Sequence, residues 1–103
     1  MTLGELQDSL SQSAPPSGLP KLVVALWHEA HGDWEQAHEV AQSIEGTEGA
    51  WVHGYLHRKE GDLSNAQYWY SRAGRPRPDT PPGEEWKEIV EALLGRKASG
   101  LVG

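Results

Sequence analysis

Apolar residues recur every three or four positions in several separate segments of the chain, which is the spacing of one face of an α-helix. A short segment at residues 2–10 opens on Thr2 and Glu5, the two members of a capping box. The longer segments cover residues 21–31, 34–44, 49–60, 63–73 and 84–94, and each ends at or just before a glycine. The pattern predicts an all-α fold.

Proline and glycine divide the chain into three parts. Pro15 and Pro16 end the first short helix, so residues 1–20 are predicted to be a short N-terminal helix followed by a Pro/Ser-rich linker. Residues 21–95 are predicted to form the helical domain, and residues 96–103 a flexible tail beyond a stop at Gly95. The loop GRPRPDTPPG, with four prolines in ten residues, is predicted to be stiff and non-helical.

The middle of the chain contains an internal repeat. A shift of 29 residues places Gly32-Asp33 on Gly61-Asp62 and His28 on His57. Ala25 falls on Gly54, and both residues are small, as is needed where two antiparallel helices approach closely. In each copy the glycine ends one helix and the aspartate caps the next, so the repeat predicts two helix pairs of one design.

Residues 21–78, about half of the chain, resemble the tetratricopeptide repeat family, whose unit is a helix-turn-helix of 34 residues. The second pair carries the resemblance best, through Trp51, Gly54, Gly61-Asp62, Ala66, Tyr70, Ala73 and Pro78. The first pair departs from the pattern, since Ala41 stands where an aromatic residue is usual. The stretch GYLHRKEGD with NAQYWY is also similar to a small bacterial family of unknown function.

The tetratricopeptide resemblance implies two stacked antiparallel helical hairpins. Because roughly three such repeats are needed to bury their faces, the last helix is expected to act as a C-terminal cap. The short first helix is then expected to cover the other end or to mediate a dimer.

Composition narrows the functional classes. A chain of 103 residues has room for one domain, and the absence of cysteine excludes disulfides and thiolate metal sites. No apolar run of about 20 residues and no basic start followed by an apolar stretch is present, which favours a cytoplasmic protein and no membrane partner. A formal net charge of −6 argues against nucleic acid as a partner. Five of the nine basic residues nevertheless fall within twenty positions: Arg58, Lys59, Arg72, Arg75 and Arg77.

The resemblance implies a protein-interaction or self-association module with a protein or peptide partner. In that family the first helix of each pair lines a concave surface, which here would present Val24, His28, His53, His57 and Glu60. Arg58 and the basic loop would attract a carboxylate, although the Lys and Asn set of the family's carboxylate-binding versions is not reproduced. Tyr68 falls outside the apolar stripe and would meet a partner, the last helix or a second subunit. In the alternative, the chain's own last helix fills the groove.

A second hypothesis is a metal site, with hydrolysis as the activity that such a site could support. His53 and His57 are four residues apart and can share an ion on one helical face, with repeat-equivalent His28 as a third ligand and Glu60 or His31 as a fourth group. The bland alternative places these histidines on the polar face or at the core edge, where they bind nothing. The chain has no nucleophile, phosphate-loop or dinucleotide motif, so catalysis and a cofactor are not expected.

Overall fold

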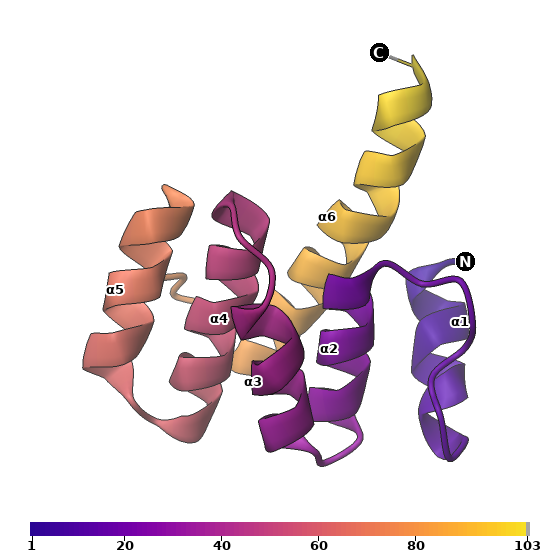
Figure 1. Ribbon diagram of the computed structural model, residues 1–103, viewed down its shortest axis with the longest axis horizontal. Coiled ribbons are helices and arrows are strands. Elements are labelled where there is room, and N and C mark those ends of the chain that lie inside the picture. Colours follow the sequence, from indigo (N-terminus) through magenta and orange to yellow (C-terminus); the bar gives the residue numbers. More distant parts are fainter. Residues whose placement is uncertain (103) are drawn as a thin grey trace.

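A computed structural model describes the backbone of residues 1–102 and the side chains of residues 1–95, and over that range the protein is all-helical, as the sequence predicts. In Figure 1, α1 to α5 follow one another across the molecule, with α5 at one edge, and α6 returns to lie against α2 and α4. The elements are α1 (Leu3–Asp8), the 3-10 turn η1 (Ser9–Ser11), α2 (Lys21–Ala30), α3 (Trp34–Gln42), α4 (Thr47–Glu60), α5 (Leu63–Ala73) and α6 (Pro82–Val102).

The N-terminal segment begins with the predicted capping box. The Thr2 hydroxyl accepts a hydrogen bond from the Glu5 backbone N–H at 3.2 Å, and the Glu5 carboxylate accepts one from the Thr2 backbone N–H at 2.8 Å. Leu6 is fully buried, and the Trp27 indole donates to the Ser9 hydroxyl at 3.0 Å. The segment is therefore attached to α2.

Helices α2 and α3 form one packed pair and α4 and α5 another, and the two pairs share one turn geometry. Gly32 and Gly61 adopt φ values of 98° and 89°, a left-handed conformation that glycine reaches without strain. The next residue donates its N–H back to a histidine carbonyl in both copies, from Asp33 to His28 at 2.8 Å and from Asp62 to His57 at 2.9 Å. The two turns thus have the same backbone geometry.

Helix α4 lies at the centre and contacts α2, α3, α5 and α6. Every residue from Gly49 to His57 is buried. A Cβ on Gly54 would lie 3.3 Å from the Tyr70 backbone nitrogen, so glycine permits the close approach of α4 and α5 that the sequence predicts. Helices α3 and α5 cover the histidine side of this helix, so His53 and His57 are buried, as the core-edge alternative expects and the polar-face alternative does not.

Helix α6 packs across α2 and α4, the first helices of the two pairs (Figure 1). Ile89 and Val90 are fully buried, and the Trp86 indole donates to the Leu26 carbonyl at 2.9 Å. The helix begins at Pro82, inside the loop predicted to be non-helical, because proline suits the first turn of a helix.

The predicted stop at Gly95 is wrong. Gly95 lies within α6 and does not take the left-handed conformation that ends α4 and α5. The flexible tail predicted for residues 96–103 lies outside the part of the chain whose side chains are described.

Candidate functional site

Three histidines from two helices converge between α3, α4 and α5. His38 comes from α3, and His53 and His57 lie one turn apart on α4. The Nε2 atoms of His38 and His53 are 2.9 Å apart, and one ring nitrogen from each of the three residues lies within 4.8 Å of the others. His53 and His57 are only 6% and 7% exposed, and His38 is half-buried. We call these three residues the histidine cluster.

Two tryptophans form walls around the histidine cluster. The Trp34 ring stacks on His38 with centroids 4.9 Å apart, and the Trp69 ring stacks on His53 at 3.9 Å. The Trp34 indole also donates to the Leu56 carbonyl at 2.7 Å, which fixes α3 against α4. Trp34 and Trp69 thus pack directly against two of the three imidazoles.

The environment of His38 and His53 favours the uncharged form of these two imidazoles. Burial, with smaller contributions from His38 and His57, lowers the pKa of His53 from its usual 6.5 to about 4. Burial, followed by His57, also lowers the pKa of His38. Neutral imidazoles offer a nitrogen lone pair, which a protonated ring does not. Beside them, Nδ1 of His57 lies 3.3 Å from a carboxylate oxygen of Glu60.

An open cleft of about 650 Å³ adjoins the histidine cluster. Its lining comes from the end of α3, the loop to α4, the start of α4 and one side of α5, and includes His53, Trp69 and Arg72. The Arg72 guanidinium lies 5.7 Å from the Tyr68 ring centroid and 5.6 Å from that of Trp69, and it donates to the Tyr68 hydroxyl at 3.3 Å. Tyr68 is 54% exposed, so an aromatic ring and a cation lie together at the surface.

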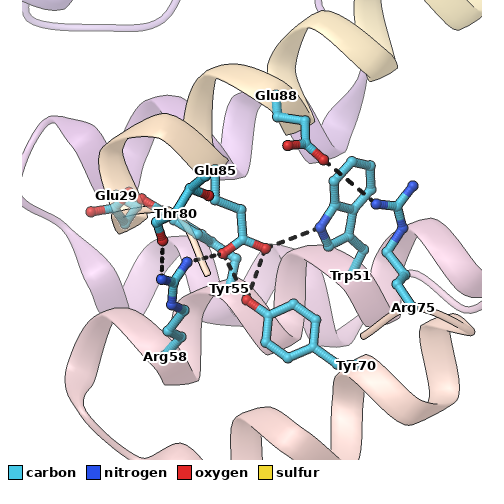
Figure 2. A network of polar contacts seen from close by, with 9 residues as sticks. All are labelled: Glu29, Trp51, Tyr55, Arg58, Tyr70, Arg75, Thr80, Glu85 and Glu88. Atoms are coloured by element: carbon cyan, nitrogen blue, oxygen red, sulfur yellow. Dashed lines mark hydrogen bonds and ion pairs between the residues drawn. The ribbon is translucent and has the colours of Figure 1, made fainter. Parts of the chain in front are cut away.

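A second polar cluster joins α4, α5 and α6 around Glu85, a carboxylate that is 1% exposed (Figure 2). It accepts hydrogen bonds from the Trp51 indole at 3.1 Å and from the Tyr70 hydroxyl at 2.7 Å, and it pairs with Arg58 at 2.9 Å. Burial and the bond to Glu85 raise the pKa of Tyr70. Arg58 also donates to the Thr80 carbonyl. Glu85 is therefore an anchor that holds α6 against the second helix pair.

Glu29 has a similar role on α2. Its carboxylate accepts a hydrogen bond from the Tyr55 hydroxyl at 2.6 Å and pairs with Lys59 at 3.1 Å. The burial of Tyr55 and its hydrogen bond to Glu29 raise the pKa of the Tyr55 phenol. Figure 2 includes both Glu29 and Tyr55. Among the described residues, every buried side-chain nitrogen and oxygen has a hydrogen-bond partner. The Glu29 and Glu85 groups are thus saturated by the protein itself.

The residues expected to line a first-helix groove are dispersed. The cationic group of Arg58 is engaged by Glu85, and α6 packs on the face that the first helices share. Val24 is half-buried, whereas Glu60 and Tyr68 are exposed. Helix α6 thus packs on α2 and α4, whereas His53 and His57 lie against residues of α3 and α5.

His28, the expected third histidine, is not in the cluster. Its half-buried ring meets the edge of Trp27 at 5.4 Å, and neighbouring His31 contacts the Gln12 carbonyl at 2.9 Å. On α2, His31 thus contacts the N-terminal segment, whereas on α4, His53 contacts His38 of α3. His38 takes the third place, and its only signal in the sequence is its position four residues after Trp34, on which it stacks.

Comparison of the chain with known protein families, with curated proteins and with solved structures gives no match. None of the helices in the described part of the chain combines the length and the apolar character that crossing a bilayer requires.

Proposed function

We propose that the protein is a helical-repeat interaction module of the tetratricopeptide type, without catalytic activity, in the cytoplasm. The two helix pairs share one turn, with a left-handed glycine, a capping aspartate and a backbone bond to a histidine carbonyl. This recurrence supports a repeat architecture, and helical repeats commonly serve as surfaces for other proteins.

The binding surface in this proposal is the cleft beside α5, in place of the face expected from the family resemblance. Helix α6 packs on α2 and α4 through the buried Trp86, Ile89 and Glu85. A partner on that face would have to displace these contacts. The cleft lined by Trp69 and Arg72 is open and needs no such displacement.

The single observation that carries the proposal is the exposed ring of Tyr68 beside Arg72, the arginine that lines this cleft. Tyrosine and arginine are enriched at the energetic centres of protein interfaces. The guanidinium lies against aromatic rings and retains its charge for a carboxylate. The chemistry favours a partner segment in which an acidic group follows or precedes an apolar side chain.

The test is recovery of a partner from the lysate of the native cell, followed by direct binding of a peptide from that partner. Tyr68→Ala and Arg72→Ala should each weaken binding of the peptide about tenfold or more, as expected for residues at the centre of an interface. Lys87→Ala is the matched control, because Lys87 is an exposed cation on α6. It should leave the affinity unchanged.

A partner that binds both cleft variants as tightly as the parent protein would refute the proposed surface. A protein that recovers no partner would contradict the proposed function. Concentration-dependent dimerisation abolished by Tyr68→Ala would instead identify the occupant as a second copy of the chain.

A further inference from the structure

The histidine cluster has an arrangement that packing alone does not require. Side chains from α3 and α4 direct three imidazoles to one place, where His38 and His53 make a hydrogen bond to each other. The other buried polar groups around Glu85 and Glu29 pair donors with carboxylates. Here two neutral bases meet instead.

We infer that His38, His53 and His57 are the ligands of a divalent transition-metal ion of the Zn²⁺ class. Imidazole nitrogen binds Zn²⁺, Co²⁺, Ni²⁺ and Cu²⁺ well, whereas Ca²⁺ and Mg²⁺ prefer oxygen. Three protein ligands with one open position are sufficient for zinc.

The distances fit this ion after small adjustments. Zinc binds histidine nitrogen at about 2.0 to 2.1 Å with tetrahedral geometry, so two ligand nitrogens lie about 3.3 Å apart. The two closest nitrogens, those of His38 and His53, are 2.9 Å apart, and the three ligand atoms are all within 4.8 Å of one another. Ring movements of about 1 Å or less, on the order of a rotamer adjustment, would bring them into place.

The proton positions also suit an ion. The 2.9 Å contact between two Nε2 atoms holds one proton between them. An ion at this place would take over both lone pairs, and that proton would move to Nδ1 or leave to solvent. Binding is thus expected to exchange the hydrogen bond between the histidines for two metal bonds.

Glu60 supplies an outer partner. Its carboxylate lies 3.3 Å from Nδ1 of His57, so it can accept a hydrogen bond from Nδ1–H and leave Nε2 to bind the ion. Metal-binding histidines commonly donate their second nitrogen to a carboxylate in this way. Glu60 is exposed, and its replacement should leave the core intact.

The fourth position would face outward. His38 is half-buried and His53 borders the open cleft, so water or a group from solvent can reach an ion at the histidine cluster. The rings of Trp34 and Trp69 stack on His38 and His53 and would flank the ion.

The experiment is a zinc titration of the purified protein after removal of metal by a chelator, with bound zinc measured after gel filtration. Cobalt in a parallel titration reports the geometry through its visible spectrum. One Zn²⁺ ion per chain is expected for the parent protein. His38→Gln should weaken binding at least about 100-fold, and Glu60→Gln about 10- to 100-fold, the range for loss of an outer partner.

His28→Gln is the matched control, because His28 is also half-buried, rests against a tryptophan and is the repeat counterpart of His57. It should bind zinc as the parent does. A parent protein without stoichiometric zinc, or equal affinities for the His38→Gln and His28→Gln variants, would overturn the inference. Should His38→Gln fail to fold by circular dichroism, the Glu60→Gln variant decides in the same way. The titration involves no protein partner, so its outcome is independent of the proposed interaction.

Discussion

Removal of the Glu85 carboxylate should strongly destabilise the folded protein. Glu85 is 1% exposed and serves Trp51, Tyr70 and Arg58 at once (Figure 2). In Glu85→Ala the Arg58 side chain, itself 12% exposed, loses its counterion. Two buried donors lose their acceptor in the same step.

The expected loss follows from the burial of this group. Breaking a buried ion pair by removing one partner costs about 3 to 5 kcal/mol, because an uncompensated charge remains. The unpaired indole and hydroxyl donors add to this cost, but the three contacts share one carboxylate and their costs do not sum. We expect Glu85→Ala to lower the free energy of unfolding by about 4 kcal/mol. Glu85→Gln keeps an acceptor oxygen and should lose about 2 kcal/mol.

Urea unfolding followed by tryptophan fluorescence and circular dichroism measures both variants. Glu88→Ala is the control, since Glu88 also pairs with an arginine, Arg75 at 3.8 Å, but both of those side chains are exposed. Its loss should be at most about 1 kcal/mol. A Glu85→Ala protein within about 1 kcal/mol of the Glu88→Ala control would refute the view that Glu85 anchors α6.

Three further predictions test other parts of the structure. With a chelator present to remove metal, the free energy of unfolding should fall by about 2 to 3 kcal/mol as the pH is lowered from 6.5 to 4. The reason is that His53 takes up its proton near pH 6.5 in the unfolded chain, but only near its lowered pKa of about 4 in the folded chain. Urea midpoints across this range measure the fall, and a parent protein with the same pH dependence as His53→Gln would contradict it. Asp33→Ala and Asp62→Ala should each lower the free energy of unfolding by about 1 kcal/mol, because each aspartate caps the helix that follows its Gly-Asp turn. If thermal unfolding shows that the losses of the two variants differ by more than about 1 kcal/mol, the two turns are not equivalent. Gly61→Ala should lower the free energy of unfolding by about 1 kcal/mol. The loss comes from the φ value of 89° alone, because nothing lies within 4 Å of the added Cβ. Calorimetry that shows no loss of stability would contradict this.

The helices and their turns could be predicted from sequence because their signals are local. Thr2 with Glu5 defines a capping box within four residues, and Gly61 followed by Asp62 defines a helix end and a helix start. Gly95 was misleading for the same reason. A glycine ends a helix only where the backbone turns left-handed, and at Gly95 it does not.

The candidate site was harder to predict because it depends on how helices rotate against each other. The i, i+4 spacing of His53 and His57 already places them on one face, but only the packing of α3 on α4 brings His38 within 2.9 Å. The sequence predicts His28 as the third ligand because a shift of 29 residues places it on His57. However, α4 follows α3, which supplies His38, whereas α2 follows only the short N-terminal segment. The burial of His53 also has a non-local cause, since α4 has neighbours on every side.

X-ray absorption at the zinc K-edge measures the chemistry of the histidine cluster most directly. The zinc-loaded parent protein should give three imidazole nitrogens at about 2.0 to 2.1 Å, and zinc-loaded His38→Gln should give two. A shell of oxygen ligands, or the same spectrum from both proteins, would contradict a site built from His38, His53 and His57.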